Sequence, residues 1–207
     1  MGNVSERRKQ PPQVGVSVVI LALGPVPQSD VGAGAASSGM GSILWMPLVK
    51  RVRQPFLGQW ALPGGGLRAD HSLEQSAYAA LESTTSLHPK YLEQLYTFGD
   101  PARSHGGLPM VSIVYWALVG EADGRIDFAG GDNVKWFPVN HLPELAFDHR
   151  TIVEYAMNRL RGKIESPDIA TRLVGERFTL SQLHDVYEGI AGPVSYTHLR
   201  SHETRSN

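Results

Sequence analysis

The sequence contains no cysteine among its 207 residues, which excludes disulfide bonds and thiolate metal sites. It also lacks a long apolar run, because the first one, residues 14–23, is too short to cross a bilayer and is rich in β-branched residues. The net charge of −1 gives no overall basic excess of the kind that nucleic-acid or anionic-membrane binding needs. We therefore expect a cytoplasmic protein that does not associate with membranes.

Local sequence patterns predict a set of strands and two long helices. The helix expected over residues 72–87 opens with Ser72 and Gln75 at the spacing of a capping box. A second helix is expected over residues 148–164, where apolar side chains recur with a 3.6-residue period. Strands are expected over residues 14–23, 42–49, 91–98, 110–119 and 134–137. The order of these elements indicates an α+β protein with a mixed sheet between helices.

Three segments are expected to lie outside the regular elements. Residues 25–41, dominated by glycine, alanine, serine and proline, should form the loop of a hairpin between the first two strands. Residues 64–66 are three consecutive glycines, and we expect a tight turn there. The polar, basic residues 1–12 are expected to be disordered, which leaves residues 13–165 as the main domain.

The sequence changes in character beyond Ser166 and Pro167. Short helices are expected over residues 169–174 and 180–190, and we interpret residues 166–192 as the start of a small helical domain whose remaining elements are missing. The apolar side chains of this segment would then have nothing to pack against, so we expect it to be mobile or loosely docked. These side chains are Leu183, Val186, Tyr187 and Ile190.

Residues 60–66, Trp-Ala-Leu-Pro-Gly-Gly-Gly, followed by a helix, resemble the signature of Nudix hydrolases. With Gly65 at the first glycine of that signature, Leu81 and Leu87 keep its two aliphatic positions. The charged positions are not kept. His71 stands for the first glutamate, Ala79 and Ala80 for the Arg-Glu pair, Ser83 and Thr84 for the paired glutamates, and Ser86 for the late glycine.

The lost positions are those that hold a metal in the family the sequence resembles. Mg²⁺ prefers oxygen ligands, in practice carboxylates together with phosphate and water. Glu74 and Glu82 remain on the helix, but neither occupies a metal position in this register, and we expect both to be surface charges. We therefore predict no metal site, no Mg²⁺ cofactor and no catalytic residue.

Two further motifs resemble the ADP-ribose-type branch of the Nudix family: Tyr-Thr-Phe-Gly-Asp-Pro-Ala-Arg over residues 96–103 and Ala-Phe-Asp-His over 146–149. Residues 160–165 leading into 178–188, which begin with Phe-Thr-Leu-Ser-Gln, are similar to the Nudix-related transcriptional regulators of the NrtR family. The resemblance implies an α/β/α Nudix sandwich followed by a winged helix-turn-helix, here truncated. It also implies a homodimeric repressor of NAD-metabolism genes that responds to ADP-ribose or a related nucleotide.

The matching motifs nominate ligand contacts in this sequence. Glycines at 64–66 allow phosphates to approach the backbone closely, and arginine guanidinium groups suit a diphosphate. The aromatic side chain at residue 60 or 98 would pack against the adenine or ribose of the ligand. The alternative, with equal weight, is that these side chains only pack in the protein core. Asp148 has an alternative role as the N-cap of the last helix. The full set is Arg53, Trp60, Gly64, Gly65, Gly66, Phe98, Arg103, Asp148 and His149.

DNA contacts are expected from the segment after residue 166, through Arg172, Arg177, Thr179 and Ser181. Residues 193–207 do not continue the winged-helix pattern, and Val-Ser-Tyr-Thr-His-Leu-Arg with His-Glu-Thr resembles a translated sequencing adapter. We expect this tail to be non-native and the natural protein to be longer.

Two other functions remain open. The first is an active Nudix hydrolase, an ADP-ribose or nucleoside diphosphate pyrophosphatase, with Glu74, Glu82 and Asp148 as substitute metal ligands. The second is a ligand-binding module that has lost its role on DNA. A metal-dependent turnover assay separates the repressor from the hydrolase, and the full-length gene sequence separates it from the module.

Overall fold

The computed structural model describes residues 11–27, 42–104, 109–120 and 125–163, and the single residues Leu173, Tyr187 and Ile190. Its core is a mixed sheet of seven strands in the order β3-β2-β1-β6-β5, with β4 also on β1 and β7 on β2. The strands are β1 (Gln13–Pro25), β2 (Ser42–Lys50), β3 (Trp60–Ala61), β4 (Gly64–Gly66), β5 (Tyr91–Phe98), β6 (Met110–Val119) and β7 (Val134–Pro138). The helices are α1 (Leu73–Thr85), α2 (His149–Lys163) and the short 3-10 turns η2 (Pro101–Ser104) and η4 (Val139–His141).

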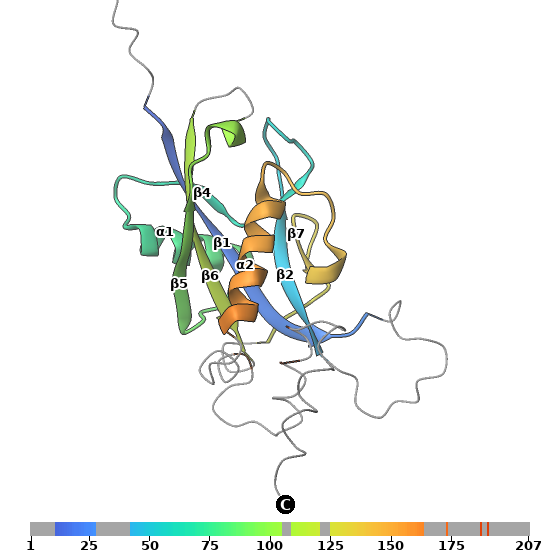
Figure 1. Cartoon of the computed structure of the whole chain (residues 1–207). Coiled ribbons are helices and arrows are strands. Elements are labelled where there is room, and N and C mark those ends of the chain that lie inside the picture. The colour runs from blue at the N-terminus through green and yellow to red at the C-terminus, as the bar shows by residue number, and fades with distance from the viewer. Residues whose placement is uncertain are drawn as a thin grey trace, which may run out of the picture.

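Strand β1 lies at the centre of the sheet and pairs in parallel with β6 and antiparallel with β2 and β4. Helix α1 covers one face of the sheet and α2 the other (Figure 1). Side chains of β1 therefore alternate between two cores, with Val18 and Ile20 against α1 and Val19 and Leu21 against α2. The predicted buried strand, hairpin and mixed sheet are confirmed.

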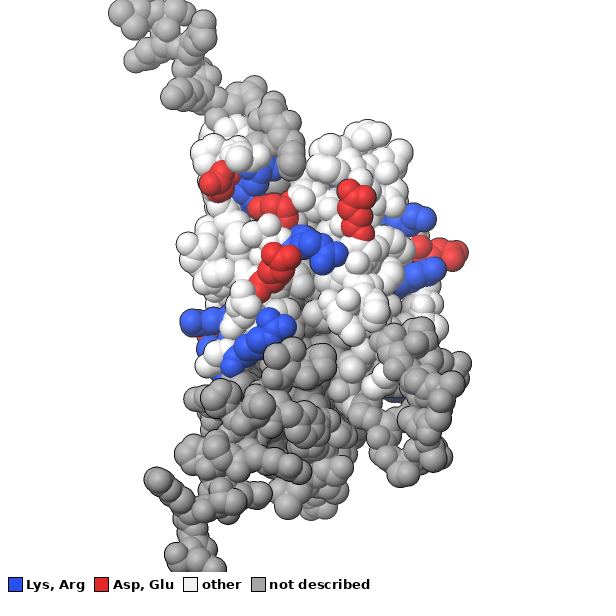
Figure 2. All heavy atoms as spheres, turned by 45° about the vertical axis from the view of Figure 1, so that its right-hand side comes forward, with Lys and Arg blue, Asp and Glu red and all other residues white. Residues whose placement is uncertain are grey.

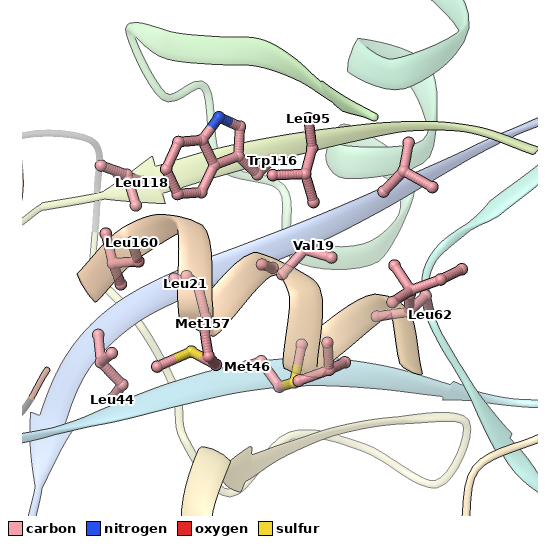
Figure 3. Close-up of a cluster of buried hydrophobic side chains, with 14 of the residues drawn as sticks. Val19, Leu21, Leu44, Met46, Leu62, Leu95, Trp116, Leu118, Met157 and Leu160 are labelled. Carbon is pink, nitrogen blue, oxygen red and sulfur yellow. The ribbon is translucent and has the colours of Figure 1, made fainter. Parts of the chain in front are cut away.

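The core under α2 is built from side chains of β1, β2, β5, β6 and the helix (Figure 3). Leu21 of β1, Met46 of β2 and Trp116 of β6 are fully buried or nearly so, and Leu160 of α2 packs on them. At the far end of α2, Lys163 Nζ lies 2.9 Å from Glu93 Oε2 of β5, which ties the end of the helix to the sheet edge. Helix α2 is therefore held along its whole length.

The three residues described beyond residue 166 contribute to this same core, contrary to our expectation. Leu173 is 2% exposed and Ile190 is 1% exposed, and both belong to the cluster under α2, against which Tyr187 also packs. The expectation that Tyr187 and Ile190 would have nothing to pack against is wrong, because the apolar face under α2 offers them a surface. The predicted DNA contacts and residues 193–207 lie outside the described residues.

The three glycines form strand β4 and not the expected turn. Gly64, Gly65 and Gly66 pair antiparallel with residues 15–17 of β1. Gly64 has φ +156°, and a Cβ there would lie 2.3 Å from the carbonyl oxygen of Val16. Only glycine lets the backbone come this close to β1, which explains a strand where glycine usually indicates a turn.

The face of the molecule shown in Figure 2 has no strong charge segregation. Acidic and basic side chains intermingle on this face. No helix in the described residues is long and apolar enough to cross a membrane.

Candidate functional site

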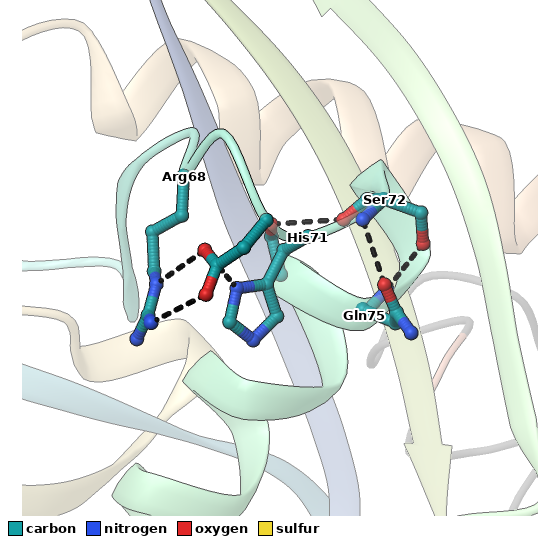
Figure 4. A network of polar contacts seen from close by, with 6 residues as sticks. Arg68, His71, Ser72 and Gln75 are labelled. Carbon is teal, nitrogen blue, oxygen red and sulfur yellow. Dashed lines mark hydrogen bonds and ion pairs between the residues drawn. The ribbon is translucent and has the colours of Figure 1, made fainter.

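Helix α1, which carries the box, begins as the sequence predicted. The side chain of Ser72 accepts a hydrogen bond from the backbone N–H of Gln75 at 3.1 Å, and the Gln75 side chain accepts one from the Ser72 N–H at 2.8 Å (Figure 4). This reciprocal capping box fixes the start of the helix directly after the loop from β4.

His71, which stands at the first glutamate position of the box, is held by its neighbour. Its Nδ1 lies 3.0 Å from Asp70 Oδ1, and Arg68 forms a bidentate ion pair with the same carboxylate (Figure 4). These contacts lower the pKa of Asp70, with the Arg68 hydrogen bonds as the main cause. The group is a surface cluster within one loop, because the side chains of Arg68 and Asp70 are 68% and 65% exposed.

The remaining box positions do not suit a magnesium ion. Ala80 has no ligand atom, and the hydroxyls of Ser83 and Thr84 both donate to the carbonyl of Ala80, at 3.0 and 2.7 Å. Neutral hydroxyls bound to their own helix are poor replacements for carboxylates on a hard cation. Glu74 and Glu82 are exposed, as predicted. Within the described part of the chain, no group of three His, Asp or Glu side chains is placed to hold a metal ion.

The densest polar network lies instead at the start of α2. Arg103 from η2 forms an ion pair with Asp148, with Nε to Oδ2 and Nη2 to Oδ1 both at 2.9 Å. Its third nitrogen, Nη1, donates to the carbonyl of Phe98 at 2.7 Å. Burial by itself would raise the pKa of Asp148, but the hydrogen bonds and charge of Arg103 hold it below its ordinary value. The Arg103 side chain is 5% exposed, and all its nitrogen atoms are engaged.

His149, the first residue of α2, joins this network to the strand that leads to the box. Its Nδ1 accepts a hydrogen bond from the backbone N–H of Leu62 at 3.0 Å. Burial lowers the pKa of His149 to about 4, and the charges of Arg103 and Arg51 act in the same direction against that of Asp148. The ring is therefore neutral near pH 7. Because Nδ1 accepts, the ring proton is on Nε2.

A cation and two aromatic rings complete this corner, and the sequence did not nominate them. The Arg51 guanidinium lies over the Phe147 ring at 4.5 Å, and the Phe147 ring contacts those of Phe56 and His149 at 4.7 and 5.4 Å. Phe56 and Phe147 have φ values of 66° and 56°, a region that bulky residues rarely adopt. Phe147 lies within the Ala-Phe-Asp-His motif, but its pairing with residue 51 depends on the fold. We call Arg51, Phe56, Arg103, Phe147, Asp148 and His149 the α2 corner.

The other nominated residues are distributed around this corner. Trp60 and Phe98 are partly buried and both pack against the core under α2, and their contact with a ligand stays a prediction. The carbonyl of Trp60 accepts the Ala146 N–H at 2.8 Å, which places β3 beside the α2 corner. Arg53 is exposed in the loop after β2. The backbone of Gly65 and Gly66 has open space around it, since a Cβ at either would meet nothing within 4 Å.

A pocket of about 200 Å³ opens elsewhere, at the C-terminal end of α1. It combines a cation, Arg125, with the carboxylate of Asp127 and the negative end of a helix dipole. These charges oppose one another, and none of the nominated ligand residues lines the pocket. We therefore take the α2 corner as the candidate site. The pocket is lined by Thr84, Thr85, Leu87, Arg125, Ile126, Asp127, Gly130, Gly131, Val134 and Trp136.

Comparison with known proteins shows the family to which this fold belongs. Residues 37–156 match the NUDIX domain family. The chain is 29% identical over 172 residues to the ADPR responsive transcriptional repressor NtrR of Acinetobacter baylyi, covering 81% of this chain and 67% of the relative. It is 33% identical over 118 residues to the ADP-ribose pyrophosphatase of Methanocaldococcus jannaschii, covering 56% of this chain and 67% of the relative.

The structure is also similar to that of Shewanella oneidensis NrtR, with a TM-score of 0.69 and 31% identity over 91% of this chain and 83% of that one. The same Shewanella protein has been solved with a 27mer DNA, with a TM-score of 0.68 and 31% identity over 91% of this chain and 80% of that one. Its NUDIX domain has been solved with ADP ribose, with a TM-score of 0.54 and 32% identity over 76% of this chain and 94% of that one. The chain therefore belongs to the NUDIX domain family and, within it, to the NrtR group.

Proposed function

We propose that this chain is an ADP-ribose-responsive transcriptional repressor whose Nudix domain binds its ligand without hydrolysing it. The observation that carries the proposal is the box helix, which keeps its cap and its buried leucine but has Ala80, Ser83 and Thr84 at metal positions. A hydrolase of this family needs a metal to polarise the diphosphate and the attacking water. A sensor needs only the binding surface.

The relatives support a protein in which one part senses the nucleotide and another binds DNA. The Acinetobacter protein is named as a repressor that responds to ADPR, and the Shewanella protein has been solved with DNA and, as its NUDIX domain, with ADP ribose. In this proposal residues 13–165 form the sensor and residues 166–192 begin the DNA-binding module. We further expect the repressor to act as a homodimer on paired half-sites.

The repressor role is tested by a gel shift with the chromosomal region upstream of the gene, at physiological salt. We expect a chain with a complete C-terminal module to bind this DNA and to release it on addition of ADP-ribose. The matched control is the 207-residue chain, which we expect to bind only weakly. Failure of the complete chain to bind, or binding that ADP-ribose does not change, would contradict the repressor role.

Active hydrolysis is the second candidate function, because the Methanocaldococcus relative is named as an ADP-ribose pyrophosphatase. Glu74 and Glu82 are the carboxylates on the box helix that could serve it. A turnover assay with ADP-ribose and Mg²⁺ or Mn²⁺ separates the two functions. Metal-dependent release of AMP that Glu82→Gln abolishes would establish the hydrolase and overturn our proposal.

A further inference from the structure

We propose that Arg51 and the Nε2–H of His149 form the anion-binding end of the ligand site, and that Arg103 only holds this site in shape. The inference rests on the proposed function, because it takes the ligand to be a phosphate-bearing nucleotide. It assigns the phosphate contact to an arginine that the sequence motifs did not single out. It also replaces Arg103, the motif arginine, in that role.

Arg103 is unsuited to hold a ligand because its side chain is only 5% exposed and each of its three guanidinium nitrogen atoms already donates a hydrogen bond. Two of its nitrogen atoms bind Asp148 and the third binds the carbonyl of Phe98. To reach a phosphate, it would have to leave a carboxylate that is itself only 23% exposed. Leaving one member of a buried ion pair unpaired is strongly unfavourable.

Arg51 has the capacity that Arg103 lacks. Its Nε donates to the carbonyl of Pro55 at 2.9 Å, and Nη2 reaches the carbonyl of Arg53 only at 3.5 Å, the outer limit of a hydrogen bond. Among the described residues, Nη1 has no hydrogen-bond partner. The Phe147 ring holds the guanidinium in place without using its N–H groups. The group is therefore positioned and still able to donate.

His149 supplies a second donor beside it. The residue is only 7% exposed, its Nδ1 is used by the N–H of Leu62, and no described residue accepts from its Nε2. The Nε2–H of this neutral ring is therefore available to donate to a ligand. Arg51 and His149 both contact the Phe147 ring, so the two donors lie near one another.

The charge balance and the helix start favour the same ligand chemistry. Asp148 is paired with Arg103, whereas Arg51 donates only to backbone carbonyls, so the positive charge of Arg51 has no carboxylate partner in this corner. Asp148 would ordinarily cap the first N–H groups of α2, but its carboxylate is bound to Arg103. No described group accepts from the N–H of Arg150 or Thr151. An anion is the ligand that this arrangement stabilises.

Titration calorimetry with ADP-ribose and with inorganic pyrophosphate tests the assignment. We expect Arg51→Gln to weaken ADP-ribose binding about ten- to hundredfold, since it removes a charge-assisted contact. Arg159→Gln, at an exposed arginine farther along α2, should change the affinity less than about twofold. His149→Asn keeps an acceptor for the Leu62 N–H but removes the Nε2 donor, so it should weaken binding about three- to tenfold. Circular dichroism checks that each variant is folded.

The outcomes separate this inference from the function on which it rests. Wild-type affinity in folded Arg51→Gln or, should that variant not fold, in His149→Asn overturns the assignment and leaves the proposed sensor intact. A wild-type protein that does not bind ADP-ribose overturns the proposed function. If that protein still binds pyrophosphate and loses it in Arg51→Gln, the anion site stands with a different ligand. Absence of both kinds of binding overturns both proposals.

Discussion

The box helix α1 and the α2 corner use their polar groups in opposite ways. Ser83 and Thr84 of α1 bond to a carbonyl of their own helix, so their hydroxyls join no other part of the molecule. Arg103, Asp148 and His149 instead join η2, the end of β5, the start of α2 and the residue after β3. Short side chains could replace the metal-binding ones on α1 without disturbing the fold, whereas substitutions at the corner should affect structure and binding together.

The largest effect should come from breaking the ion pair of the α2 corner. Arg103→Met leaves the partly buried Asp148 carboxylate and the Phe98 carbonyl without their partner. We expect the free energy of unfolding to fall by about 3–5 kcal/mol, measured by urea denaturation. Arg159→Met, at an exposed arginine of α2, should change it by less than about 0.5 kcal/mol. Equal effects of the two substitutions would remove the contrast between corner and surface.

The second largest effect should appear in the pH dependence of stability. The folded pKa of His149 is about 4 and its ordinary value 6.5, so between these values the unfolded chain binds the extra proton. Stability should therefore fall by up to about 3 kcal/mol as the pH drops from 6.5 to 4. Asp148 affects stability only at lower pH. Because its pKa in the folded protein lies below 3.8, its contribution to the free energy of unfolding is lost only as the pH falls below 3.8.

His149→Asn is the matched variant, since its amide oxygen can still accept from the Leu62 N–H but does not titrate. Its stability should change much less between pH 6.5 and 4 than that of the wild type. Thermal unfolding followed by circular dichroism at several pH values gives the comparison. Parallel curves for the two proteins would show that His149 is not the buried titrating group.

The smallest effect is expected on the box helix. Removing both hydroxyls with Ser83→Ala and Thr84→Ala should change the free energy of unfolding by less than about 0.5 kcal/mol. Both hydroxyls bond only to a carbonyl of their own helix, and alanine has the higher helix propensity. The substitutions should also leave ligand affinity unchanged. A loss of affinity would place the ligand on α1 and would reverse the comparison between the two regions.

Much of the fold could be predicted from the sequence because its signals are local. The continuous β-branched run of β1, the capping box at Ser72 and the period of α2 each appear within a few residues. The glycine strand β4 could not, since its glycines permit a close approach to Val16, far away in the sequence. The burial of Ile190 was missed for a similar reason, because its packing surface belongs to another element.

The candidate site was predicted in part. Asp148 and His149 were nominated from a motif, and both lie in the α2 corner. Arg51 was missed because its role depends on Phe147, which is far away in the sequence. Only the fold brings the Phe147 ring to 4.5 Å from the Arg51 guanidinium. The Arg103–Asp148 ion pair could not be predicted for the same reason. The sequence motif therefore suggested that Arg103 binds the ligand, whereas in the structure it binds Asp148.

The most direct test of the account is calorimetric titration of the wild-type chain with ADP-ribose, once with EDTA and once with Mg²⁺, followed by chromatography of the ligand. A site that uses arginine and histidine donors in place of a metal should bind with the same affinity in both buffers. The ADP-ribose should be recovered intact from both. Binding that requires Mg²⁺, or recovery of AMP and ribose phosphate from the Mg²⁺ sample, would contradict the central claim that this Nudix domain binds without metal and without hydrolysis.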